Sequence, residues 1–178
     1  MSTELEFGFK RLSPQNWLEP EDLSFLVSIN PISGAAKSIS RHDWAVRFLK
    51  PTLDPSIPRD VRALFEVARG AMLYGCFFYP LYTLAAEQVY RVHEAALAER
   101  CSQLGLTSVA NFAGRVECLR NLGAISAMRF AQWDAVRNLR NFASHPSKQA
   151  ILIPTQALMT LDIAVELIHD LFQVPPNG

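Results

Sequence analysis

Apolar side chains recur at helical spacing from residue 58 onward. Pro58-Arg59-Asp60 predicts the start of a helix, and the following apolar positions fall on one helix face: Val61, Leu64, Phe65, Ala68 and Met72. The chain then passes through 17 residues without a charge, 70–86. Two glycines and Pro80 lie in this run, and no second such run exists. The pattern therefore favours a buried central helix kinked near Pro80 over a membrane span.

Glycines and prolines divide the remaining chain into further helical segments. The central helix should continue to Leu104 and end at Gly105, and the next helix should cover 108–122 and end at Gly123. Two more amphipathic helices are predicted over 124–144 and 154–172. No strand-type alternation or internal repeat is visible. The sequence thus predicts an all-α fold, a bundle of four to five main helices with a kinked long central helix.

Residues 1–57 form a different region, which holds five of the eleven prolines. Short helical pieces are predicted after Ser13, over 21–29 and over 41–49. We expect this region to be irregular, with its short helices packed on the body formed by residues 58–178. The sequence therefore predicts two parts, 1–57 and a helical-bundle domain over 58–178.

The helix over 124–144 has two contrasting faces. One broad face should turn toward the core; it contains Ile125, Met128, Ala131, Ala135, Val136, Leu139, Phe142 and Ala143. The opposite arc is polar but includes Phe130 and Trp133. Because two aromatic side chains are unusual on a purely solvated face, we expect a second subunit or a ligand to cover this arc.

Charge and composition narrow the possible partners. The formal net charge is zero, with 17 basic and 17 acidic residues. However, 115–148 carries six basic and two acidic residues, a local charge of +4, while 149–178 carries −3. The segment is either an anion-binding face or a solvated one. Charged residues make up only 19% of the chain, which favours a homo-oligomer that buries additional surface.

Cofactor and compartment signals are weak. Three widely spaced cysteines show neither a disulfide framework nor metal-ligand spacing, and the start of the chain lacks a signal-peptide pattern. We expect a cytoplasmic protein without metal or other cofactor and without membrane attachment. Glu166-x-x-His169 has the spacing of half a carboxylate–histidine metal site, but its second half is missing. A solvated stripe is the favoured interpretation.

One motif carries candidate chemistry: Arg140-Asn141-Phe142-Ala143-Ser144-His145, at the end of the helix over 124–144. An arginine, a polar residue, three further residues and a histidine, within an all-α domain, resemble the motif of the HEPN superfamily. Many members are metal-independent ribonucleases of prokaryotic toxin, phage-defence or RNA-processing systems. The resemblance covers about 58–172. It implies a homodimer whose two motifs share one cleft, an RNA substrate and, in toxin systems, an antitoxin or other protein partner.

The motif residues suit RNA cleavage by the substrate's own 2′-OH. A histidine near neutral pKa moves protons, and an arginine stabilises the charge that develops on the phosphorus oxygens. The resemblance makes Arg140, His145 and Asn141 the candidate catalytic residues. Nearby groups that would bind substrate are Arg137, Ser144 and Lys148. Two positions after the histidine stands Ser147, whereas toxins modified by a nucleotidyltransferase carry tyrosine there, so that kind of pairing is not predicted.

Alternatives remain for each part of this site. One helical stripe contains Glu87, Arg91 and Glu94. It is either a ladder of surface ion pairs or the source of a carboxylate that orients an arginine of the site. Glu87 is the predicted supporting residue. The motif residues could instead simply cap the helix end. A third possibility is a HEPN-like module without activity that acts as an RNA-binding or scaffold subunit.

Overall fold

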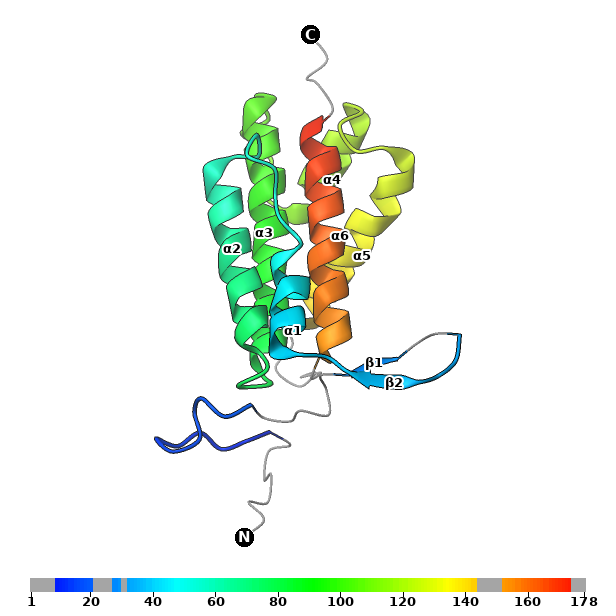
Figure 1. Cartoon of the computed structure of the whole chain (residues 1–178). Coiled ribbons are helices and arrows are strands. Elements are labelled where there is room, and N and C mark those ends of the chain that lie inside the picture. Colours follow the sequence, from blue (N-terminus) through cyan, green and yellow to red (C-terminus); the bar gives the residue numbers. More distant parts are fainter. Residues whose placement is uncertain (1–8, 21–26, 30–31, 144–151, 174–178) are drawn as a thin grey trace.

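The computed structural model describes residues 9–20, 27–29, 32–143 and 152–173 (Figure 1). Within these ranges the backbone forms a helical body and one small hairpin. The elements are β1 (Val27–Ile29), β2 (Ala36–Ser38), α1 (Arg41–Leu49), α2 (Arg59–Tyr74), α3 (Leu81–Gln103), α4 (Phe112–Asn121), α5 (Ala127–Ala143) and α6 (Pro154–Gln173). The predicted all-α class is confirmed for the body of the protein.

The uncharged run from 70 to 86 is not one kinked helix, as the sequence predicted, but the turn of a helical hairpin. Helix α2 ends at Tyr74, α3 begins at Leu81, and the two helices lie side by side in opposite directions (Figure 1). A Cβ atom added at Gly75 would lie 2.5 Å from the ring of Tyr82, so the close return of the chain requires glycine there. Pro80 then caps α3 at its N-terminus instead of bending a continuous helix.

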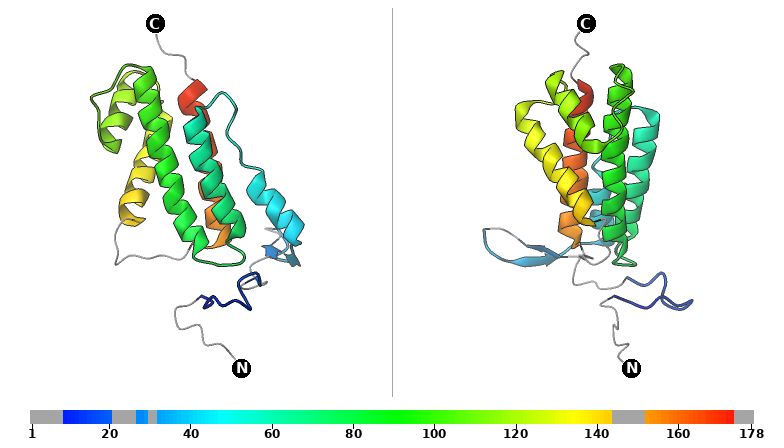
Figure 2. Two further views of the ribbon diagram at one scale, coloured as in Figure 1. Left: turned by 90° about the vertical axis from the view of Figure 1, so that its left-hand side faces the viewer. Right: turned by 180° about the vertical axis from the view of Figure 1, so that it is seen from behind.

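Helix α3 is the centre of the bundle. Seen from the side, α4 and α5 lie beyond one flank of α3, whereas α2, α6 and then α1 lie toward the other (Figure 2). Its ten buried positions cover about half of its circumference, and the exposed Leu84, Glu87 and Arg91 lie on the opposite side. The core joins these layers through large side chains that are almost fully buried, among them Phe65, Met72, Leu97, Trp133 and Leu161.

The ends of α3 and α4 follow the glycine signals in the sequence. Gly105 and Gly123 both adopt positive φ, +74° and +75°, directly after these helices. Helix α4 begins four residues later than predicted because Asn111 caps it by accepting a hydrogen bond from the backbone N–H of Gly114 at 2.7 Å. Among the described residues, none of the helices is both long enough and apolar enough to cross a membrane.

The N-terminal region contains less helix than the sequence predicted. Helix α1 is present, and its Trp44 and Phe48 pack toward the ring of Tyr82 on α3. The predicted helical piece over 21–29 is wrong at its end, because 27–29 is a strand that pairs antiparallel with β2. Residues 14–18 form turns and no regular helix. Gly34, with φ +68°, supports the reversal of the chain between the two strands. Such a turn depends on the local backbone, so the helical periodicity of apolar residues does not predict it.

The predicted orientation of α5 is wrong. Trp133, expected on the outer arc, is 1% exposed and packs edge-to-face against His93 and near Phe112. Most of the expected core face instead points to solvent, with Met128 83% and Leu139 54% exposed, whereas Ile125 and Val136 of that face are buried as predicted. The physical reason lies in partners from other helices, since acids on α3 and α6 meet arginines on the arc that carries Trp133 and so allow it to pack inward.

Candidate functional site

The candidate motif begins on the last turn of α5. This helix ends at Ala143, so Arg140 and Asn141 belong to its final turn, with Asn141 exposed. Arg137 lies one turn before Asn141 on the same side of the helix, as the spacing predicted. Three further predicted site residues, Ser144, His145 and Lys148, fall outside the described residues. Of the candidate catalytic residues, the structure therefore describes Arg140 and Asn141.

Arg140 is held by a carboxylate from the central helix. Its Nη2 donates to Oε2 of Glu94 at 3.0 Å, across the contact between α5 and α3. The side chains remain 38% and 35% exposed, so solvent reaches both. Of the two acids considered as orienting groups, Glu94 makes this contact, whereas Glu87 lies exposed two turns earlier on α3, and its supporting role stays a prediction.

Arg137 belongs to a second ion pair on the same helix. Its Nη2 lies 2.7 Å from Oδ1 of Asp134, and Oδ2 of Asp134 accepts from the amide of Asn138 at 3.3 Å. The Nε–H of Arg137 is buried and has no hydrogen-bond partner. Helical spacing alone predicts the i, i+3 pair, but the buried Nε–H depends on the packing of α5 against α4.

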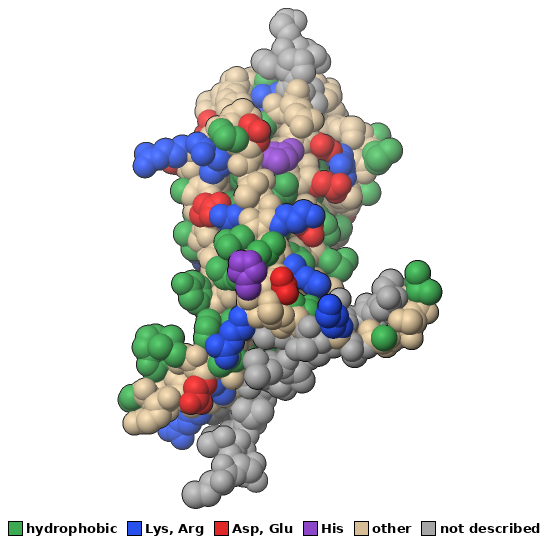
Figure 3. All heavy atoms as spheres, in the orientation of Figure 1, with side chains coloured by type: hydrophobic (Ala, Val, Ile, Leu, Met, Phe, Trp, Pro, Cys, Tyr) green, Lys and Arg blue, Asp and Glu red, His purple; other side chains and the backbone are tan. Residues whose placement is uncertain are grey.

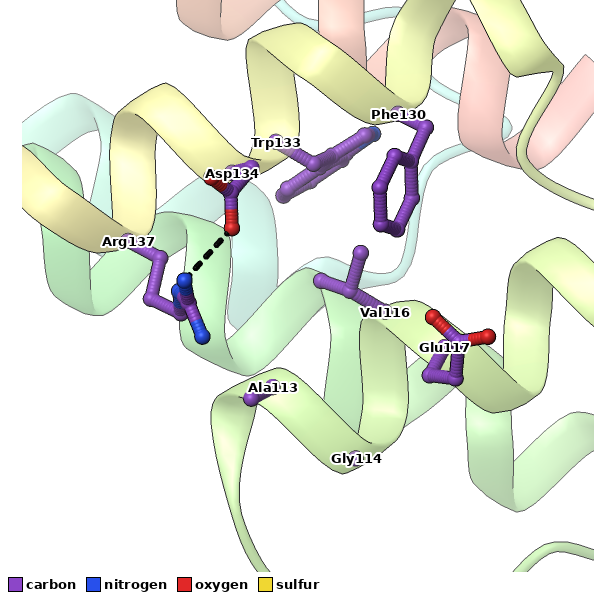
Figure 4. Close-up of a pocket in the computed structure, with 8 residues that line it drawn as sticks. All are labelled: Ala113, Gly114, Val116, Glu117, Phe130, Trp133, Asp134 and Arg137. Atoms are coloured by element: carbon purple, nitrogen blue, oxygen red, sulfur yellow. Dashed lines mark ion pairs between the residues drawn. The ribbon is translucent and has the colours of Figure 1, made fainter.

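A cavity of about 330 Å³ lies between α4 and α5 beside this pair (Figure 4). Trp133 and Phe130 form its wall on α5, and the Arg137–Asp134 pair lies at one end. The facing residues on α4 are Ala113, Gly114, Val116 and Glu117. The guanidinium of Arg120 lies 4.3 Å from the centre of the Phe130 ring. An aromatic wall next to a charged pair is suited to a small ligand.

A second cavity, of about 370 Å³, adjoins the start of α5 and the end of α6. Its main charged groups already satisfy one another: Arg129 donates from Nε to Asp170 at 2.5 Å and pairs with Glu166 at 3.3 Å. Hydrogen bonding to Asp170 raises the pKa of Arg129 above its ordinary value. These contacts fasten α5 to α6 and leave little polar capacity for a ligand.

The described residues contain no group of three or more His, Cys, Asp or Glu side chains placed to hold a metal ion. Both side chains of the Glu166-x-x-His169 sequence contact other parts of the protein. Glu166 pairs with Arg129, and Nε2 of His169 accepts a hydrogen bond from the backbone N–H of Asp54 at 2.9 Å. The stripe predicted to be solvated on α6 thus makes specific contacts with α5 and with the segment before α2.

In the folded protein, acidic side chains from other helices lower the net positive charge around the basic segment 115–148. Glu94, Glu166 and Asp170 come from outside 115–148 and lie against its arginines. The described residues 115–143 carry five basic and two acidic residues, +3, and adding these three negative charges leaves a net charge of zero. The face that carries α1 and α6 also mixes basic and acidic side chains (Figure 3). A strong local field for anions is therefore absent from the described part of the segment.

His93 is a core residue behind the cavity wall. Its Nδ1 lies 2.9 Å from the carbonyl oxygen of Val89, so Nδ1 carries the proton, and Nε2 is buried without a hydrogen-bond partner. Burial lowers the pKa of His93 from 6.5 to about 4. A histidine with this pKa stays neutral at physiological pH, which suits packing against Trp133.

Comparisons of the chain with models of protein families, with curated protein sequences and with solved structures found no match.

Proposed function

We propose that this chain is a metal-independent endoribonuclease of the HEPN type that acts as a homodimer. The observation that carries the proposal is the Glu94–Arg140 pair, which fixes a partly exposed guanidinium on the turn where the motif begins. In the proposed reaction the RNA 2′-OH attacks the adjacent phosphorus while the P–O5′ bond breaks, which leaves a 2′,3′-cyclic phosphate and a 5′-OH end. His145 of one copy takes the 2′-OH proton, and His145 of the second copy donates a proton to the leaving O5′. Arg140 stabilises the phosphorane oxygens and Asn141 supports it.

The fixed arginine suits this chemistry because the transition state gains negative charge at a defined place. A guanidinium oriented in advance stabilises that charge without reorganising during the reaction. Glu94 supplies the orientation from α3, and the 38% exposure of Arg140 leaves it accessible to a phosphate. In the proposal, Arg137, Ser144 and Lys148 bind neighbouring phosphates, and Glu87 has at most a supporting role.

The outward face of α5 supports the homodimer. Five exposed apolar side chains share a helical arc of about 80°. They are Met128, Ala131, Ala135, Leu139 and Phe142. The two alanines in the middle allow a second helix to approach closely, and the larger residues at both ends fill the space beside it. The stripe ends at Phe142, on the same last turn as Arg140, so a second copy packed here would reach the end of α5. The Arg140 side chain itself points about 140° round the helix from the stripe, toward Glu94. The stripe replaces the aromatic arc as the predicted interface.

The decisive test is cleavage of mixed RNA in excess EDTA by wild type, Arg140→Ala and His145→Ala. We expect wild type to release 2′,3′-cyclic phosphate ends and each variant to lose at least about 100-fold in rate. Arg59→Ala, which removes an exposed arginine at the start of α2, is the matched control and should cut like wild type. Equal rates for all four proteins would rule out the nuclease.

A second function is favoured by the compensated charge around the motif. With Glu94 against Arg140 and no residual net charge, the described surface attracts RNA only weakly, whereas the apolar stripe on α5 is suited to protein contact. The alternative proposal is an inactive HEPN-like module that serves as a scaffold or RNA-binding subunit, for example beside an antitoxin. Absence of cleavage together with dimers that the Leu139→Lys change dissociates would support it.

A further inference from the structure

The cavity between α4 and α5 has the size of a site for a single heteroaromatic group. Its volume of about 330 Å³ lies at the lower end of the range for ligand sites, about 300–1,000 Å³. Phe130, Trp133 and Val116 make much of its lining apolar (Figure 4). A single nucleobase is small enough for such a volume.

The polar groups of the cavity define which edge a ligand must present. Asp134 offers carboxylate oxygens, which also accept from Arg137 and Asn138, and Arg137 offers the outer N–H groups of its guanidinium, because its Nε–H is buried. Both side chains are about two-fifths exposed, at 42% and 39%, so a ligand can reach them. The complementary ligand carries neighbouring N–H donors for the carboxylate and, next to them, an acceptor for the guanidinium.

Guanine has this arrangement on one edge. Its N1–H and N2–H groups are adjacent donors that a carboxylate accepts together, and its O6 is the acceptor beside them. Adenine and cytosine present one exocyclic donor next to ring acceptors, and uracil presents one donor between two acceptors. An acceptor facing Asp134 would be repelled, so these three bases fit the charged pair less well.

We propose that this cavity is a subsite for a guanine base, held by Asp134 and Arg137 against the wall formed by Trp133 and Phe130. The inference rests on the proposed ribonuclease function and gives it a base preference. Arg137 lies one helical turn, about 6 Å, before Asn141, so the base would bind beside the motif. The subsite opens between α4 and α5, whereas the apolar stripe faces the other way, so a second copy on the stripe would leave the subsite open.

The test is a titration of the intact protein with 5′-GMP, AMP, CMP and UMP, followed by the NMR signal of the Trp133 indole N–H. We expect GMP to bind at least about tenfold more tightly than the other three nucleotides. Asp134→Asn, which removes the charge, and Ala113→Phe, which fills the cavity from α4, should each weaken GMP binding about tenfold or more. Asp162→Asn removes an exposed carboxylate of α6 outside the cavity and should bind GMP as wild type does. Circular dichroism verifies that each variant is folded.

Failure of the subsite and failure of the nuclease give different results. No binding, equal binding of the four nucleotides, or an Asp134→Asn protein that binds GMP as wild type does would overturn the guanine subsite. If GMP binds as expected but RNA stays intact in EDTA, the nuclease proposal fails and the subsite stands. If RNA is cut without preference for guanine and Ala113→Phe cuts as wild type does, the subsite is refuted while the nuclease stands.

Discussion

Acidification should destabilise this protein through His93. The folded protein holds His93 neutral, with a pKa of about 4, whereas the unfolded chain has the ordinary value of 6.5. Between these two pKa values the unfolded chain binds a proton at His93 and the folded protein does not. The stability that the neutral, buried His93 contributes is therefore fully present above pH 6.5 and is lost as the pH falls toward 4. Protonation would place a charged Nε2–H in the core, where it has no acceptor.

The size of the effect follows from the difference of 2.5 between the two pKa values. At 1.36 kcal/mol for each unit, the full loss is about 3 kcal/mol, and roughly 2 kcal/mol of it has occurred at pH 5. A loss of this size is a large fraction of the stability of an ordinary domain, about 5–15 kcal/mol. The residue is 1% exposed, so solvent does little to screen the effect.

Urea unfolding at pH 7.5 and pH 5.0, followed by circular dichroism, measures this loss. The comparison is His93→Asn, which keeps an N–H near the position of Nδ1 and has no group that titrates in this range. All other acids and histidines are common to both proteins, so their contributions cancel in the difference. We expect wild type to lose about 2 kcal/mol more than the variant over this interval. Parallel losses in the two proteins would refute the burial argument.

Three further outcomes test other parts of the structure. Gly75→Ala should lower the free energy of unfolding by about 1–3 kcal/mol, because its Cβ would meet the Tyr82 ring at 2.5 Å; an unchanged urea midpoint would contradict this packing. Leu139→Lys should dissociate the proposed dimer in sedimentation velocity, whereas Val67→Lys, at an exposed position on α2, should not. Glu94→Gln should slow RNA cleavage about tenfold yet change stability by less than about 1 kcal/mol, since the pair is over a third exposed; a rate equal to wild type would argue against an orienting role.

The extent of the helices could be predicted from the chain because the signals are local. The starts at Pro58 and Pro154, and the ends before Gly105 and Gly123, all lie within a few residues of the observed helix boundaries. These residues act on their own backbone, through a fixed φ or a tolerated positive φ. The helical spacing of apolar residues likewise identifies α4 and α6 as separate helices, whereas it merged α2 with α3.

What the sequence determined by itself was thus the all-α class, most helix boundaries and the position of the arginine motif on the last turn of α5. Tertiary structure decided which face of α5 is buried, where α2 gives way to α3, and which carboxylate meets Arg140. The sequence pattern counts the apolar residues on each helix face, but burial also depends on what the neighbouring helices offer. Acids on α3 and α6 stabilise the arginines that flank Trp133, so that arc packs inward and leaves the apolar stripe outside.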